Sequence, residues 1–187
     1  GFVGNFTDSK GLSMILDAAK NLKNKKIKFL VVGPVKKKPS LYGNFLHFLS
    51  FRKNYSEQII KNSESSKNIY FVGFREKLSD FYNKIDVVAF PSYLNAAGRP
   101  VLEGALNGIP SIIALDKGVK NDLVKNNYNG LYCLKNDSDD FSKKIIKIFE
   151  NRNLYKKLSN NCLISSEKKF NLDRNGKKFS KMLNHKL

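Results

Sequence analysis

A short loop in the middle of the chain carries residues suited to binding a phosphorylated diol. Ala96, Ala97 and Gly98 are small residues that expose backbone at the start of a predicted helix, which begins at Arg99. Free N–H groups at a helix N-terminus, together with the helix dipole, bind anions such as phosphate, and Arg99 would add positive charge. Glu103 lies about one turn into this helix, where its carboxylate would accept hydrogen bonds from two hydroxyls. The alternative is structural: a glycine for tight packing and a solvated glutamate.

A second loop, Gly4–Gly11, contains two glycines and joins a predicted strand to a predicted helix. Lys10, at the start of that helix, is placed to reach a phosphate. The loop is not a Walker loop, which needs Gly-Lys-Ser/Thr after a four-residue gap, nor the Gly-x-Gly-x-x-Gly loop of dinucleotide-binding folds. On this loop alone, a plain capped helix start with an exposed lysine is the favoured interpretation.

Hydrophobic patterning indicates the elements that position these loops. Six short apolar runs have the length of strands: residues 1–4, 27–32, 68–72, 86–90, 110–115 and 130–134. Runs that are apolar on both faces are typical of parallel sheets covered by helices on each side. Their alternation with amphipathic stretches predicts an α/β fold, a Rossmann-like doubly wound parallel sheet of about six strands with helices on both faces. Such sheets bind ligands at the carboxyl ends of their strands, where both loops lie.

Apolar residues at helical spacing predict the connecting helices. These cover residues 12–22, 44–63, 78–82, 99–106, a short helix at 123–124, and most of the chain from 137 onward. The sequence contains no internal repeat and no linker long enough to divide the chain. We therefore expect residues 1–187 to form one domain, with a helical tail over about 153–187.

The composition is that of an ordinary globular domain with a strong positive charge. Hydrophobic residues make up 41% of the chain, so disorder is not expected. The formal net charge is +18, from 34 Lys and Arg against 16 Asp and Glu. The lysines are spread over every segment and interleave with acidic residues, which is typical of a solvated surface. Only Lys36–Lys38 forms a tight run, and it is either a solvated loop or a contact with anionic lipid.

Several function classes find no support in the sequence. No apolar run approaches the roughly 20 residues of a membrane-spanning helix. Two cysteines, Cys133 and Cys162, and two distant histidines, His47 and His185, indicate neither a disulfide framework nor a metal site. A nucleic-acid-binding module, which the charge suggests, lacks a helix-turn-helix, zinc-finger or aromatic RNA-binding signature, so no specific nucleic acid is expected as a partner.

Glycines, prolines and polar residues in and between the predicted elements have a characteristic order. They are Gly4, Lys10-Gly11, Gly33, Gly73, Asp86, Pro91-Ser92, Gly98, Glu103, Gly108-Ile-Pro110, Asp122 and Asn129-Gly130. This ordered set resembles the C-terminal domain of retaining GT-B glycosyltransferases of family 4, the glycosyl transferases group 1. The resemblance extends from residue 1 to about 170 and is most specific from Pro91 to Pro110.

The resemblance implies a site for a nucleotide sugar, in a cleft that faces a separate N-terminal acceptor domain absent from this chain. Glu103 matches the second Glu of the family's Glu-x7-Glu motif and would bind the ribose hydroxyls. Lys10 matches the lysine that contacts the donor diphosphate. Backbone N–H groups of Ala97–Arg99 would hold phosphate or sugar, and Gly73 and Phe74 would lie beside the base.

Two positions depart from the family pattern. Asn95 stands where the motif has its first Glu, and Asn5 stands where the family has an Arg five residues before Lys10. Asn95 can still donate a hydrogen bond to a sugar hydroxyl but carries no charge. With Asn5 uncharged, neutralising the diphosphate falls to Lys10, aided by Arg99. These changes bear on the identity of the donor and on catalytic competence.

The resemblance therefore implies a retaining glycosyltransferase that uses a nucleoside-diphosphate sugar and needs no metal or other cofactor. This chain would be its donor-binding half and inactive alone. It would act in the cytoplasm or peripherally at the inner face of the cytoplasmic membrane. Three alternatives stand beside it: a sugar-nucleotide epimerase half, a degenerate nucleotide-binding scaffold suggested by Asn5 and Asn95, and a basic nucleic-acid-binding module.

Overall fold

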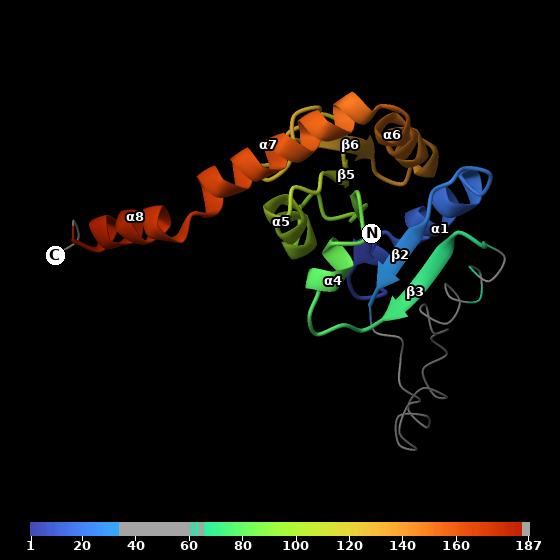
Figure 1. The fold of residues 1–187 in the computed structure, drawn as a ribbon, viewed down its shortest axis with the longest axis horizontal. Helices are drawn as coiled ribbons and strands as arrows, with labels where there is room; N and C mark the ends of the chain where they lie inside the picture. Colours follow the sequence, from blue (N-terminus) through green and yellow to red (C-terminus); the bar gives the residue numbers. More distant parts are fainter. Residues whose placement is uncertain (34–60, 62, 64–65, 185–187) are drawn as a thin grey trace, which may run out of the picture.

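The computed structural model describes residues 1–33, 61, 63 and 66–184 (Figure 1). Most of the helix predicted at 44–63 lies outside the described residues, as do Lys36–Lys38, His47 and His185. The described part is an α/β structure with two parallel three-stranded sheets. Their orders are β1-β2-β3 and β4-β5-β6. The strands are β1 (Phe2–Val3), β2 (Phe29–Val32), β3 (Ile69–Gly73), β4 (Val88–Phe90), β5 (Ser111–Leu115) and β6 (Gly130–Leu134).

The two sheets are joined at Gly1. The Gly1 nitrogen donates to the Val87 carbonyl oxygen at 2.6 Å, and the Ala89 N–H donates to the Gly1 carbonyl oxygen at 2.8 Å. These two bonds have the pattern of a parallel ladder, in which one residue bonds to both neighbours of the residue opposite it. The strands therefore follow the order β3-β2-β1-β4-β5-β6. All six are parallel, and the point where the strand order reverses lies between β1 and β4. This confirms the predicted doubly wound parallel sheet, whose ligand edge lies at the carboxyl ends of the strands.

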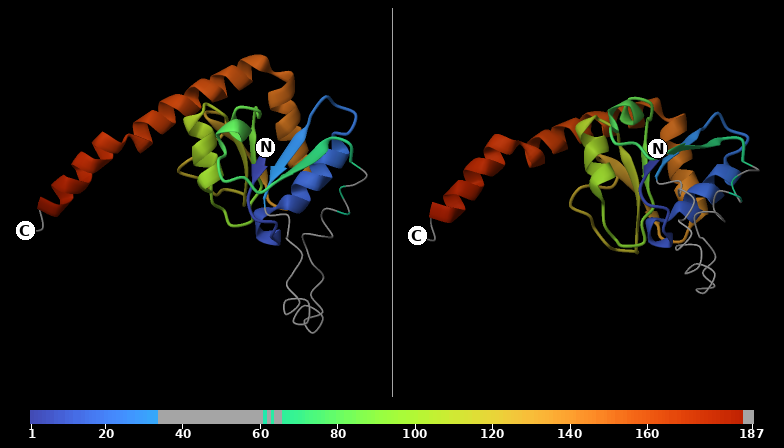
Figure 2. Two further views of the ribbon diagram at one scale, coloured as in Figure 1. Left: turned by 60° about the horizontal axis from the view of Figure 1, so that its bottom comes forward. Right: turned by 90° about the horizontal axis from the view of Figure 1, so that it is seen from below.

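Helices cover both faces of the sheet, as predicted (Figure 2). The helices with described bounds are α1 (Leu12–Asn21), α4 (Ser79–Tyr82), α5 (Arg99–Leu106), α6 (Ser138–Glu150), α7 (Arg152–Phe170) and α8 (Leu172–Asn184), with a 3-10 turn at Asp8–Lys10. Of these, α8 lies beyond the sheet. Strand β5 shows why both faces must be covered, because all five of its residues are buried. Ile112 packs into a core with α1 and α6, whereas Ile113 packs into a second core with α4 and α5.

The C-terminal helices extend beyond the sheet. Helix α7 runs from α6 across to α5 and buries Leu158, Cys162 and Ser166 on the way (Figure 1). Helix α8 continues away from the body of the molecule. Cys133, in β6, is also buried. None of the described helices is both long and apolar enough to cross a bilayer.

The prediction of a short helix at residues 123–124 is wrong, because the chain forms a bend there instead. The Asn121 side-chain oxygen accepts the N–H groups of Leu123 (2.9 Å) and Val124 (3.0 Å). The Asn129 side chain accepts from the Lys125 N–H at 2.7 Å and donates to the Leu123 carbonyl at 3.0 Å. Asparagine side chains that bond to nearby backbone compete with helix formation, and here they take the groups a helix would use.

Candidate functional site

The two loops that the sequence singles out are held against each other at the carboxyl edge of the sheet. Gly11 has a positive φ of 70°, and a Cβ there would lie 1.9 Å from the Pro91 carbonyl oxygen. The Ser9 carbonyl oxygen accepts the Ser92 hydroxyl (3.1 Å) and the Tyr93 N–H (3.0 Å). The loop before α1 and the loop before α5 therefore form one surface, and only glycine fits at their closest approach.

The Phe90 ring, at the end of β4, brings Lys10 and Gly98 together. The Lys10 ammonium lies 5.7 Å from the centre of this ring, within the range of a cation–π contact. A Cβ on Gly98 would lie 2.6 Å from the ring carbon Cζ of Phe90. Gly98 has an extended backbone that any residue adopts, so crowding against the ring is the reason for a glycine there. Two residues predicted to contact the donor phosphates thus share one aromatic neighbour.

The free N–H groups at the start of α5 lie just before Pro100. Gly98 is the N-cap residue, and no side chain caps the helix. Pro100 has no N–H, and the Val101 N–H already bonds to the Gly98 carbonyl at 3.0 Å. Among the described residues, the N–H groups of Ala97, Gly98 and Arg99 donate to no protein acceptor, so these three predicted donors are still available to an anion.

The Glu103 carboxylate is held by two donors. Arg99 donates from Nε to Oε1 at 2.9 Å, and the Tyr82 hydroxyl donates to Oε2 at 2.7 Å. The Arg99 side chain is 80% exposed, and that of Glu103 is 28% exposed, so the carboxylate is fixed yet still reachable. Burial first, and then the bond to Glu103, raise the pKa of Tyr82 well above its ordinary value, so the phenol stays a donor. Tyr82 was missed in the sequence, where it reads as one apolar position of a short helix.

Asn95 turns towards the residue after β5 and not into open space. Its Nδ2 donates to Asp116 Oδ2 at 2.6 Å, and its Oδ1 accepts the Asp116 N–H at 2.9 Å. Asn95 itself has a positive φ of 52°. Lys135, from the loop after β6, donates to the same Asp116 oxygen at 2.8 Å. The bonds from Lys135 and then from Asn95 lower the pKa of Asp116 below its usual value. Both polar groups of Asn95 are therefore engaged.

We expect this cluster to stabilise the fold in a pH-dependent way. The pKa of Asp116 is lower in the folded chain than the value of about 3.9 expected when unfolded. Its contribution is therefore present above that pH and is lost as the pH falls through the folded pKa. Asp116→Asn should melt below wild type at pH 7, with the difference shrinking towards pH 3. Thermal unfolding at both pH values checks this, and an equal deficit at both would contradict it. Asp122→Asn, at another exposed aspartate, is the control.

The remaining predicted site residues lie at the ends of β1 and β3. Asn5 is exposed. Gly73 has a φ of 75°, and its carbonyl oxygen accepts the Gly33 N–H at 3.4 Å. Phe74 is 67% exposed and follows Gly73 directly. They share the carboxyl edge with Lys10 and Glu103, but the described contacts do not link them to either residue. Their predicted roles beside the base and the diphosphate stay predictions.

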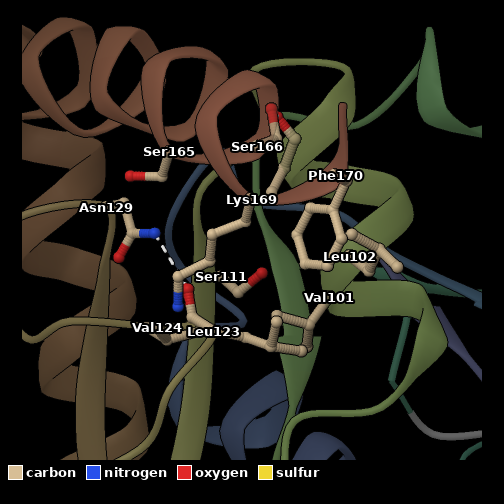
Figure 3. Close-up of a pocket in the computed structure, with 11 residues that line it drawn as sticks. Val101, Leu102, Ser111, Leu123, Val124, Asn129, Ser165, Ser166, Lys169 and Phe170 are labelled. Atoms are coloured by element: carbon tan, nitrogen blue, oxygen red, sulfur yellow. Dashed lines mark hydrogen bonds between the residues drawn. The ribbon is translucent and has the colours of Figure 1, made fainter. Parts of the chain in front are cut away.

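Two cavities formed by the described residues lie away from this edge. A small one, of about 10 Å³, separates α5 from α7 (Figure 3). Val101, Ser166 and Phe170 line it, and Asn129 donates to the Leu123 carbonyl beside it. This volume suits at most a single water molecule. A larger cavity of about 480 Å³ lies between the starts of β2 and β4, at the amino edge of the sheet. Neither cavity is lined by a predicted site residue.

Metal-ligating side chains do not gather in the described part of the chain. Within those residues, no group of three or more His, Cys, Asp or Glu side chains is placed to hold a metal ion. The expectation that donor binding needs no cofactor stays a prediction.

Comparisons with known proteins point to one family. The model of the family "Glycosyl transferases group 1" matches residues 1–162. An uncharacterised glycosyltransferase of Methanocaldococcus jannaschii is 28% identical over 160 residues, which cover 86% of this chain and 40% of the relative. The capsular polysaccharide biosynthesis glycosyltransferase CapM of Staphylococcus aureus is 23% identical over 172 residues, covering 91% and 41% of the two chains.

A solved structure agrees with this fold. The chain superposes on Anabaena HepE, crystallised in complex with UDP, with a TM-score of 0.74 and 19% identity over 98% of this chain and 48% of that one. This likeness identifies the Rossmann-like C-terminal domain of GT-B proteins. The chain spans about 40% of the length of the Methanocaldococcus jannaschii relative and of CapM. Because the family model covers most of its residues, the chain belongs to the glycosyl transferases group 1 family.

Proposed function

We propose that this chain is the donor-binding half of a retaining glycosyltransferase and binds a nucleoside-diphosphate sugar. Membership of the family supports the reaction class. The observation that carries the proposal is the Glu103 carboxylate, fixed by Tyr82 and Arg99 at the carboxyl edge of the sheet. A fixed and partly exposed carboxylate is suited to accepting two hydroxyl donors, as a ribose presents them.

The three charged residues of the site, Glu103, Lys10 and Arg99, each bind a different part of the donor or add charge beside it. Glu103 binds the ribose hydroxyls, and Lys10, positioned over Phe90, binds the diphosphate. The exposed guanidinium of Arg99 has further donors besides the Nε that bonds to Glu103, and it adds positive charge near the diphosphate. Glycosyl transfer leaves negative charge on the departing diphosphate, and fixed cations stabilise that charge in the transition state. Gly73 and Phe74 contact the base, and the backbone of Ala97–Arg99 contacts phosphate or sugar.

The departures from the family pattern shift where the donor is held. Asn5 brings no charge to the diphosphate, so Lys10 and Arg99 carry that role. Asn95 already bonds to Asp116 through both of its polar groups. A sugar hydroxyl would therefore compete with Asp116 for Asn95. This competition bears on which sugar is accepted and supports a donor preference different from that of relatives with a glutamate at this position.

The identity of the substrates follows from the relatives as a proposal. HepE was crystallised with UDP, which makes UDP the first nucleotide to test. CapM is named for capsular polysaccharide biosynthesis, which suggests a glycan acceptor. A location at the cytoplasmic face of the membrane is part of our proposal. The acceptor would be bound by an N-terminal domain facing the carboxyl edge of the sheet. The present chain alone would then bind the donor without transferring the sugar.

A panel of nucleotides tests the proposal directly. UDP, GDP, ADP and CMP, with their common sugar conjugates, are added to the chain and its melting temperature is measured. A ligand at a hundred times its dissociation constant stabilises by about 2.7 kcal/mol, so one nucleoside diphosphate should raise the melting temperature clearly. Lys10→Ala should weaken that nucleotide about tenfold, since charge-assisted hydrogen bonds contribute about 1.5–3 kcal/mol. Lys23→Ala, at an exposed lysine beyond the opposite end of α1, should not.

The absence of a shift with every nucleotide and sugar conjugate would contradict the donor-binding proposal. It would favour the degenerate scaffold instead. An equal loss of affinity in Lys10→Ala and Lys23→Ala would leave donor binding standing but remove Lys10 from it.

A further inference from the structure

Tyr82 lies in the core yet directs its hydroxyl at the proposed ribose ligand. It is the last residue of α4, a helix of four residues, and the residue is 4% exposed. Its ring packs edge-to-face on Phe81, with the ring centres 5.6 Å apart, and joins the core that Val101 of α5 also enters. The phenol can move little, so the position of its oxygen is set by the packing of α4 against α5.

The hydroxyl has one proton, and Glu103 receives it. The Tyr82 oxygen is 2.7 Å from Glu103 Oε2 and 3.4 Å from the Pro100 carbonyl, so the carboxylate is the better acceptor in both distance and charge. The other carboxylate oxygen accepts from Arg99 at 2.9 Å. A carboxylate has about four acceptor positions, two on each oxygen. One position on each oxygen is therefore still available.

Two available positions, one on each oxygen, match the two donors of a vicinal diol. The Arg99 bond cannot fix the carboxylate alone, because the Arg99 side chain is 80% exposed and lies on the same helix as Glu103. Tyr82 comes from a different element and is buried, so it supplies the rigid part of the arrangement. A bond from a fixed phenol restricts the rotation of the glutamate side chain before any ligand arrives.

We infer that Tyr82 is a positioning residue for nucleotide binding: its hydroxyl holds Glu103 so that each carboxylate oxygen keeps one acceptor position for a hydroxyl of the ribose. This rests on the proposed function, since it needs Glu103 to be the ribose ligand. Tyr82 itself does not touch the nucleotide. Its effect therefore depends on the presence of the ribose diol.

The test compares a nucleotide with and without that diol. Of UDP, GDP and ADP, the one that binds wild type most tightly is titrated into wild type, Tyr82→Phe and Tyr128→Phe, together with its 2′,3′-dideoxy analogue. Tyr82→Phe removes only the hydroxyl. Tyr128 is a half-exposed tyrosine whose hydroxyl has no partner among the described residues, and it serves as the matched control. Calorimetric melting of each variant confirms that it folds.

We expect Tyr82→Phe to weaken the natural nucleotide about tenfold and to leave the dideoxy analogue unchanged, so that the variant discriminates less between the two ligands. Tyr128→Phe should match wild type with both. Equal weakening of both ligands by Tyr82→Phe would show a general structural role and overturn the inference. Unchanged binding of both would overturn it as well, while the proposed function stands. If wild type bound none of the three nucleotides, the proposed function would fail and this inference with it.

Discussion

Glu103→Ala is expected to weaken nucleotide binding about a hundredfold. The carboxylate would accept two ribose hydroxyls, and two hydrogen bonds to a charged group, at about 1.5 kcal/mol each, amount to about 3 kcal/mol. Isothermal titration with the nucleotide that stabilises wild type measures this. Glu167→Ala, at an exposed glutamate of α7, should bind like wild type.

The same change acts on stability, and a second variant separates the two effects. Alanine leaves the buried Tyr82 hydroxyl without its acceptor, which costs about 1–3 kcal/mol. Glu103→Gln keeps an oxygen that can accept from Tyr82, so it should fold better than Glu103→Ala while still binding the nucleotide weakly. A Glu103→Gln variant that bound as tightly as wild type would rule out a charged carboxylate as the ribose ligand.

Gly11→Ala is expected to destabilise the fold more than any other glycine-to-alanine substitution at the site. It should lower the free energy of unfolding by about 3 kcal/mol or more. A left-handed backbone costs a residue with a Cβ about 1–2 kcal/mol, and Gly11 has a φ of 70°. In addition, the new Cβ would lie 1.9 Å from the Pro91 carbonyl oxygen, so the two loops must separate. Urea denaturation measures the loss.

Gly118→Ala isolates the first cause, the cost of a left-handed backbone. Gly118 has a similar φ of 84°, but a Cβ there meets nothing within 4 Å. It should therefore lose only the conformational part, about 1–2 kcal/mol. If the two variants were equally stable, the contact between Gly11 and Pro91 would not hold the loops together, and the shared surface at the site would lose its main support.

The elements of the fold could be predicted because their signals are local. β5 and β6 are continuous apolar runs, and α5 begins and ends at the predicted residues, Arg99 and Leu106. The bend at 123–124 was not predictable from apolar spacing, because the side chains of Asn121 and Asn129 decide it. The spacing of apolar residues does not indicate which backbone group an asparagine side chain will bond to.

The site was predictable only in part, for a related reason. The Glu103–Tyr82 and Asn95–Asp116 pairs each join residues 21 positions apart, and each depends on how one element packs on the next. The sequence indicates that Glu103 and Asn95 follow β4, where a ligand edge is expected. It does not indicate which neighbour each one meets, since that requires the depth of α4 in the core and the position of β5.

Helix α8 meets α7 at a single non-helical residue. Asn171, with φ −62° and ψ 114°, separates the two helices, and its side chain caps α8 by accepting the Arg174 N–H at 2.9 Å. The dihedral angles of Asn171 and the bond from Asn175 Nδ2 to the Lys169 carbonyl oxygen at 2.9 Å therefore set the direction of a 13-residue helix about 20 Å long. A rotation of 20° at this joint would move the far end by about 7 Å. Helix α8 lies away from the sheet, so the geometry of the joint and not packing against the sheet sets its direction.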